Sequence, residues 1–328
     1  MHLGMKRAVL ALALVAMAFP HLDAAELATT GTQILKWKDG KKAVFMLAFD
    51  DSAPSQLKNV VPELEKRKMV GNFYLVTGHG LWAMLHKQWE EAAKSPYVSV
   101  ANHTFTHKGV NNAQELEPEL AKCNEVLYNL HPEHKPPYLL GFGKPGGVPW
   151  KVTPEEVHTA LEKHHLIERP AFAGPPINFK TPEETTAFVD ATLQKGEMGQ
   201  LVFHGVGGDW LVTSVDWFTA ILDKLVSVRD QMWITDIISW HQYATERSSA
   251  EVKELKSGPD GIELELTCKA DPALYNLPLT LSSHVPSTWK NCSVTQAGHS
   301  TTTSPVKEGV VQYDAAPGAG IVSLKKAE

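Results

Sequence analysis

The sequence predicts an α/β domain of seven β/α units followed by a small all-β domain. Between residues 43 and 246, short apolar runs alternate with segments of helical periodicity, whereas after about residue 250 the apolar residues alternate strictly with polar ones. Uninterrupted apolar runs are typical of strands buried on both faces of a parallel sheet. We therefore expect a (β/α) barrel slightly smaller than the eight-fold form, or an open doubly wound sheet.

The composition is that of a globular protein with one or two domains. The 328 residues are 43% hydrophobic and 21% charged, and the formal net charge is −6. The sequence also has no low-complexity tract that would suggest disorder. The excess of acidic residues also gives no indication of a nucleic-acid partner.

Residues 1–25 are predicted to be a cleaved secretory signal. Lys6 and Arg7 precede the apolar run 8–19, and the small residue Ala25 completes the cleavage pattern. The run is shorter than a bilayer-spanning helix requires. We expect a secreted or periplasmic mature protein with no stable membrane insertion after signal cleavage.

The α/β domain is predicted at residues 26–248. Its seven strands are expected at the apolar runs 43–49, 72–76, 98–101, 138–142, 165–167, 200–203 and 232–235. Three helix starts carry a hydroxyl residue with an acid three positions later, which is the pattern of a capping box: 153–156, 181–184 and 213–216. In both candidate folds the chemistry gathers at the carboxyl ends of the strands.

The all-β domain is predicted at residues 256–328, as a β-sandwich after a charged linker at 248–257. Its strands are expected at 261–268, 277–285, 292–296, 310–313 and 320–324. Cys268 and Cys292 both fall on the apolar phase of such strands. They either pair in a disulfide or remain two buried thiols, and the pattern leaves both possibilities open.

Polar residues with catalytic potential follow the ends of three predicted strands: Asp50, Asp51, His103, His107 and His204. His103 and His107 would be about 13 Å apart in a strand, but a helical turn would place them on one face. Two imidazoles and a carboxylate make a three-ligand site for a catalytic divalent metal. The alternative is a chance spacing among fifteen histidines.

Asp50 and Asp51 are adjacent, and two close carboxylates do not both ionise cheaply without a cation. A metal on one leaves the other free as a base, provided that the backbone turns out of the strand between them. Alternatively, the pair is solvated and caps the next helix. His204 precedes a glycine-rich loop and is a third metal ligand, a general acid or a core histidine.

The ordered set Asp50-Asp51, His103-x-x-x-His107, a Pro-Gly loop and Leu201-x-x-His204 resembles the polysaccharide deacetylases of the NodB-homology group over about residues 40–246. The resemblance implies a distorted seven-stranded (β/α)7 barrel and a hydrolase that removes acetyl groups from a polysaccharide or oligosaccharide. It also implies one divalent metal ion, zinc first, with cobalt or nickel as alternatives.

The resemblance assigns the roles residue by residue. Asp50 is the base, Asp51 binds the metal with His103 and His107, and His204 is the acid. The backbone amide of Gly146 is the implied oxyanion donor.

Two departures from the family pattern affect the supporting residues. The loop at 143–147 lacks the arginine and the aromatic of the third motif, and an Asp-x-x-Asp-Trp motif is missing before His204. Arg169 is the first candidate to orient Asp50 and Lys144 the second, with Lys144 also a candidate substrate contact. Trp210 is a candidate for stacking on a sugar ring. The missing motifs motivate an alternative function, a catalytically weak carbohydrate-binding protein on the same barrel.

Overall fold

The computed structural model describes residues 31–328, and the secretory signal predicted at 1–25 lies outside this range. Seven parallel strands form the first sheet in the order β6-β5-β4-β3-β2-β7, with β8 also paired to β2. The strands are β2 (Ala43–Asp50), β3 (Gly71–Leu75), β4 (Val98–Asn102), β5 (Leu140–Phe142), β6 (Leu166–Glu168), β7 (Met198–Phe203) and β8 (Met232–Ile234). All seven predicted strands are present.

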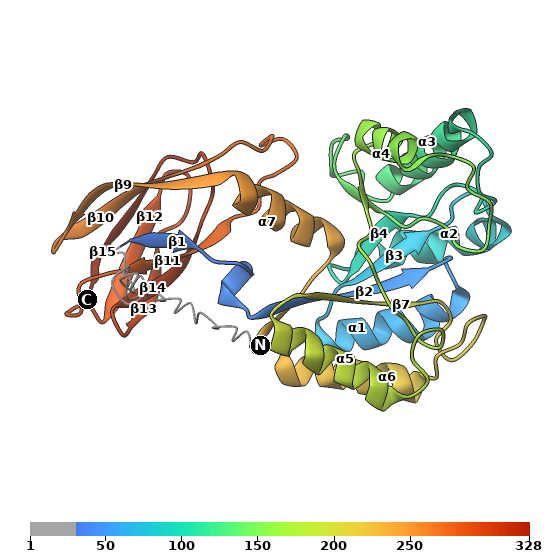
Figure 1. Ribbon diagram of the computed structural model, residues 1–328, viewed down its shortest axis with the longest axis horizontal. Coiled ribbons are helices and arrows are strands. Elements are labelled where there is room, and N and C mark those ends of the chain that lie inside the picture. Colours follow the sequence, from blue (N-terminus) through green and yellow to red (C-terminus); the bar gives the residue numbers. More distant parts are fainter. Residues whose placement is uncertain (1–30) are drawn as a thin grey trace, which may run out of the picture. The chain divides into compact units, whose positions relative to one another are not determined.

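Helices connect these strands as the β/α pattern predicts. A π-helical turn, η2 (Gln56–Val60), leads into α1, and a 3-10 turn, η1 (Lys38–Gly40), precedes β2. The α-helices are α1 (Val61–Arg67), α2 (Gly80–Ala92), α3 (Ala113–Asn129), α4 (Pro154–Lys163), α5 (Pro182–Lys195), α6 (Val215–Val228) and α7 (Ile237–Ser249). The helices α5 and α6 lie side by side in Figure 1, and Trp217 of α6 donates a hydrogen bond to Thr185 of α5 (2.9 Å).

Two of the three predicted capping boxes differ in detail from the prediction. Thr153 and Glu156 form a complete box at the start of α4. Thr181 caps α5, but the Glu184 carboxylate accepts from the backbone N–H of Lys180 instead of completing a box. The cap of α6 is Ser214, one residue after the predicted position.

The two faces of the parallel sheet have different neighbours. Alternate residues of β2, including Phe45 and Phe49, join the large apolar core beneath the helices. Ala48 points to the other face, where it contributes with Tyr74 to a small separate cluster. Because side chains alternate along a strand, Asp50 points to the same inner face as Ala48.

The chain after β6 bridges the gap between the edge strands β6 and β7. Ala173 forms an isolated parallel bridge with Leu201 of β7, and the Val202 N–H donates to the Ala173 carbonyl (2.9 Å). The predicted seven-stranded α/β fold is thus confirmed, and its parallel sheet is a half-barrel. The segment 169–174, named here the crossing segment, runs from the end of β6 to β7.

An eight-stranded antiparallel sheet forms the all-β region, in the order β1-β11-β14-β13-β12-β15-β10-β9. Five of its strands supply the buried residues of one core, and residues of the other three pack against that core. The strands are β1 (Thr32–Ile34), β9 (Ala250–Gly258), β10 (Gly261–Cys268), β11 (Leu279–His284), β12 (Asn291–Gln296), β13 (Thr302–Lys307), β14 (Val310–Ala315) and β15 (Ile321–Ala327).

Three of these strands were not predicted. The expected linker at 248–257 is wrong, because α7 runs directly into β9. The strand β1 precedes the parallel sheet in sequence yet pairs with β11, so the two sheets do not divide the chain at one point.

Cys123, Cys268 and Cys292 are all free thiols. Within residues 31–328, no helix has the length and apolar character needed to cross a membrane.

Gly174 allows the crossing segment to approach β7, and we predict that Gly174→Ala destabilises the fold. A Cβ at this position would lie 1.9 Å from the backbone carbonyl oxygen of Val202, which cannot move without shifting β7. We expect a loss of about 1–3 kcal/mol in urea unfolding. Gly258→Ala is the control, because none of the described residues has an atom within 4 Å of its added Cβ. Equal stability of the two variants would contradict the prediction.

Candidate metal centre and active site

Asp50 ends β2 as a buried carboxylate that accepts one hydrogen bond from Arg169 on each of its two oxygens. The guanidinium donates from Nη1 to Oδ1 (2.5 Å) and from Nη2 to Oδ2 (3.0 Å). The guanidinium carbon of Arg169 also lies 4.5 Å from the ring centre of Tyr74 and 4.3 Å from that of Phe172. Arg169 follows β6 directly, and its backbone N–H donates to the Phe142 carbonyl (2.8 Å). The crossing segment therefore positions the cation that compensates the buried charge of Asp50.

The backbone leaves the strand between Asp50 and Asp51, as the two-role hypothesis requires. Asp51 (φ 72°) and Ser52 (φ 56°) both occupy the left-handed region, which is uncommon for residues other than glycine. The Ser52 hydroxyl accepts from the Val76 N–H (2.9 Å) and so stabilises the turn. The two adjacent carboxylates thus point to different partners.

His103 and His107 are brought together by an irregular loop after β4, so the predicted helical turn is wrong. Thr104 (φ 63°) and His107 (φ 58°) are left-handed, which no helix allows. The Asn102 amide oxygen accepts from the Thr104 N–H (2.8 Å), and the Thr104 hydroxyl accepts from the His107 N–H (3.1 Å). Glu119 of α3 holds the loop through the N–H (2.8 Å) and hydroxyl (2.7 Å) of Thr106.

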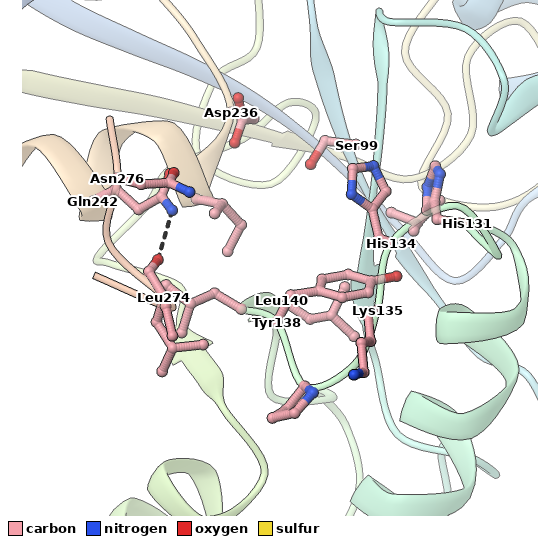
Figure 2. A pocket seen from close by; sticks show the side chains of 15 residues that line it. Ser99, His131, His134, Lys135, Tyr138, Leu140, Asp236, Gln242, Leu274 and Asn276 are labelled. Carbon is pink, nitrogen blue, oxygen red and sulfur yellow. Dashed lines mark hydrogen bonds between the residues drawn. The ribbon is translucent and has the colours of Figure 1, made fainter. Parts of the chain in front are cut away.

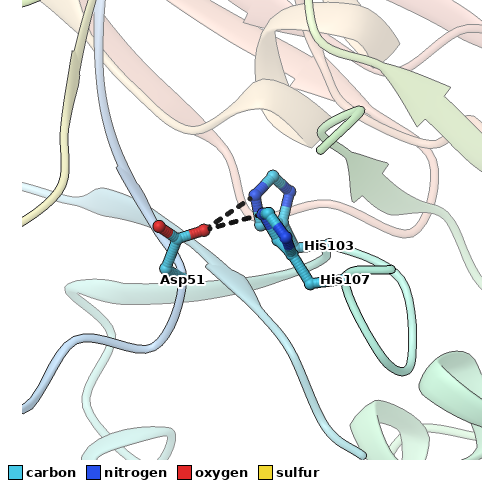
Figure 3. Close-up of side chains that lie close together, drawn as sticks. All are labelled: Asp51, His103 and His107. Atoms are coloured by element: carbon cyan, nitrogen blue, oxygen red, sulfur yellow. Dashed lines mark ion pairs between the residues drawn. The ribbon is translucent and has the colours of Figure 1, made fainter. Parts of the chain in front are cut away.

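Asp51, His103 and His107 each offer one ligand atom, and these atoms all lie within 4.8 Å of one another (Figure 3). Asp51 Oδ1 lies 3.2 Å from Nε2 of both histidines. This buried oxygen has no well-directed hydrogen-bond partner among residues 31–328. The carboxylate and two imidazoles form a donor set that suits zinc and related divalent ions.

The tautomer of His103 supports this reading. Its Nδ1 lies 2.6 Å from the Gly143 carbonyl oxygen. Since a carbonyl only accepts, Nδ1 carries the proton and donates it. In the neutral ring, Nε2 then presents a lone pair to Asp51, and two facing acceptors need a cation between them. The residues present therefore fit a metal ion.

The electrostatics of the group keep the Asp51 carboxylate ionised, which a metal ligand requires. Burial opposes ionisation of Asp51, but the adjacent imidazoles of His103 and His107 hold its pKa below the usual range. The contact with Asp51 in turn raises the pKa of His107. The carboxylate thus stays ionised and partly buried, with positive charge stabilised beside it.

His204 and Trp210 both contact the second oxygen of Asp51. The Trp210 indole N–H donates to Oδ2 (2.6 Å), and His204 Nε2 lies 3.9 Å from the same atom. His204 Nδ1 is buried without a hydrogen-bond partner in the described part of the chain. His204 does not belong to the close group of ligand atoms, which separates it from His103 and His107.

A pocket with a volume of about 280 Å³ opens beside this group and is lined in part by Asp51, His107, Trp210, His79 and Lys108. The structure does not place the other two predicted contacts in it. The Lys144 ammonium lies 4.9 Å from the ring centre of Trp150, and Gly146 is exposed with open space around it. The roles suggested for Lys144 and Gly146 stay predictions.

Gln56 supports the site and was missed by sequence reasoning. Its buried amide donates to the backbone carbonyls of Asp50 (2.6 Å) and His204 (3.1 Å), and so joins the ends of two strands. A signal was present, because Gln56 is a polar residue on the same helical stripe as the apolar residues Val60 and Leu64. A buried polar side chain in such a position needs partners.

A family model described as polysaccharide deacetylase matches residues 38–166. This segment carries a polysaccharide deacetylase domain. The match includes Asp50, Asp51, His103 and His107 and ends before Arg169. The deacetylase domain thus contributes the whole three-donor group, while Arg169 and His204 lie in the part of the chain that follows the match.

Individual relatives are more distant. A gellan lyase from a Bacillus species is 30% identical over 86 residues, which is 26% of this chain and only 4% of that protein. A family 4 carbohydrate esterase from Streptomyces lividans, solved with acetate, is 15% identical (TM-score 0.45) over 60% of this chain and 94% of its own. A putative polysaccharide deacetylase from Mycobacterium smegmatis is 14% identical (TM-score 0.47), with coverages of 64% and 93%.

We predict that Trp210→Phe weakens zinc binding without unfolding the protein. The substitution keeps a large ring but removes the N–H that orients the Asp51 carboxylate, and loss of such a partner typically costs about 10–100-fold in metal affinity. Isothermal titration of the metal-free protein with Zn²⁺ measures the effect. Trp217→Phe is the matched control, because its indole N–H bonds Thr185, away from the site. The same affinity in both variants would argue against this role for Trp210.

Proposed function

We propose that this chain is a metal-dependent hydrolase that removes acetyl groups, N-linked or O-linked, from a polysaccharide or oligosaccharide. The observation that carries the proposal is a free base candidate beside a three-donor group. Asp50 Oδ2 lies 3.9 Å from Nε2 of His103, yet Asp50 is held by Arg169 and is not one of the grouped ligand atoms. The polysaccharide deacetylase domain at 38–166 supports the same reaction class.

A zinc, cobalt or nickel ion held by Asp51, His103 and His107 would polarise the acyl carbonyl and acidify the attacking water. Asp50 takes the proton from that water, since its carboxylate oxygens keep further acceptor sites beyond the bonds from Arg169. Arg169 fixes the direction of this carboxylate through two hydrogen bonds. Trp210 orients the Asp51 carboxylate through one hydrogen bond to Oδ2.

His204 is the proposed proton donor to the leaving nitrogen or oxygen. Its Nε2 lies 3.9 Å from Asp51 Oδ2, whereas Asp50 Oδ2 lies 3.9 Å from Nε2 of His103. The proposed acid and the proposed base thus lie near different members of the three-donor group. Such separation is what acid and base roles in one reaction require. The pocket lined by Trp210 and Lys108 is the proposed entry for the acetylated sugar.

The missing third-motif arginine no longer favours the alternative of a catalytically weak binding protein. Arg169 supplies a guanidinium to Asp50 from a different strand end. We also propose a secreted or periplasmic location on the pattern of residues 1–25. Amino-terminal sequencing of the exported protein would locate the cleavage site.

The test is acetate release from acetyl xylan, acetylated chitooligosaccharides and peptidoglycan by the metal-loaded protein. We expect release from at least one of these substrates, and a chelator should abolish it. Asp50→Asn and His204→Ala should each lower kcat by about 10²–10⁴-fold, because each removes one proton-transfer group. Circular dichroism checks that the variants fold.

Asp216→Asn and His158→Ala are the controls, since Asp216 of α6 and His158 of α4 are both exposed. Unchanged acetate release by Asp50→Asn and His204→Ala would contradict the proposed mechanism. Glycan binding without acetate release on any substrate would favour the carbohydrate-binding alternative.

A further inference from the structure

A second group of two imidazoles and one carboxylate lies in the loop between α3 and β5. Glu133 Oε1 lies 3.3 Å from Nδ1 of His131 and 3.5 Å from Nε2 of His134. One ligand atom from each of the three residues lies within 4.8 Å of the others. A turn creates this proximity, in which the His134 N–H donates to the His131 carbonyl (2.9 Å).

We propose that His131, Glu133 and His134 bind a second divalent transition-metal ion of the zinc, nickel or copper type. Metal–ligand bonds of about 2.0–2.2 Å require the ligand atoms to be about 3–4 Å apart, which is close to the observed spacing. The side chains of Glu133 and His134 are 61% and 64% exposed, so small rotations can complete the geometry. Two imidazole ligands favour these ions over calcium or magnesium.

This group is separate from the Asp51 centre and belongs to a different pocket. His131 and His134 line a pocket of about 470 Å³, together with Lys135 and Tyr138 (Figure 2). The Tyr138 hydroxyl is buried and has no hydrogen-bond partner within residues 31–328. Three protein ligands leave a fourth tetrahedral position for water or for a donor from an occupant of this pocket.

The second site should bind metal more weakly than the Asp51 centre. At that centre, Gly143 fixes the His103 ring and Trp210 fixes the Asp51 carboxylate. Among the described residues, the His131 ring hydrogen-bonds only to Glu133, and the His134 ring has no hydrogen bond but lies 3.5 Å from the Glu133 carboxylate. Outer partners of this kind are typically worth about 10–100-fold in metal affinity. We therefore expect two classes of site on one chain.

Isothermal titration of the untagged, metal-free full chain with Zn²⁺ tests the proposal. The wild type should bind a tight and a weak equivalent. His134→Ala and Glu133→Gln should each remove the weak equivalent and keep the tight one, whereas Asp51→Ala should do the reverse. Glu133 and His134 are both exposed, and circular dichroism checks that the variants fold. Visible absorption of the Co²⁺ form gives an independent count of nitrogen-ligated ions.

His158→Ala is the matched control. His158 is exposed and its Nε2 lies 3.3 Å from Glu162 Oε1, but no second imidazole within the described range 31–328 is grouped with this pair. It should retain both equivalents. A wild type with a single class of site, or a weak equivalent that survives both His134→Ala and Glu133→Gln, would overturn the proposal. Neither result depends on acetyl hydrolysis, so the two proposals fail separately.

Discussion

The buried ion pair between Asp50 and Arg169 is the interaction on which the site depends. Strand alternation forces Asp50 into the inner face of the half-barrel beside Ala48 and Tyr74, where an uncompensated carboxylate would be very costly. Arg169 compensates that charge from the chain after β6. Breaking such a pair by removing one partner typically costs about 3–5 kcal/mol. The crossing segment that carries Arg169 also pairs with β7. The ion pair with Asp50 and the link between the edge strands β6 and β7 therefore depend on the same stretch of chain.

The left-handed backbone at Asp51 gives the two adjacent carboxylates different partners. Asp50 continues the strand and meets Arg169, whereas the left-handed backbone at Asp51 sends the second carboxylate toward His103 and His107. The strained conformation is supported by hydrogen bonds from outside the turn. Gln56 holds the carbonyl of Asp50, and Trp210 holds the side chain of Asp51. The proposed base and the proposed metal ligand are thus adjacent in sequence but have different partners, Arg169 for Asp50 and the two histidines for Asp51.

The sequence predicted the strands of the half-barrel because their apolar runs are long and uninterrupted, and it predicted that strand ends would carry the chemistry. It failed where a role belongs to the backbone. The carbonyl of Gly143 fixes the His103 ring, and a carbonyl has no residue-type signal. The helical turn expected at His103 and His107 was wrong because the Asn102 side chain accepts from the Thr104 N–H and directs the loop away from a helix. The strand β9 was missed because its exposed, charged residues resemble a linker.

Crystals of the zinc-loaded protein, with anomalous diffraction at the zinc edge, test the central claim most directly. The strongest peak should lie about 2.0–2.2 Å from an Asp51 oxygen and from Nε2 of His103 and His107. Asp50 should remain unligated and keep both hydrogen bonds from Arg169. A zinc ion bound by Asp50, or an Asp50 carboxylate released from Arg169, would contradict the separation of roles.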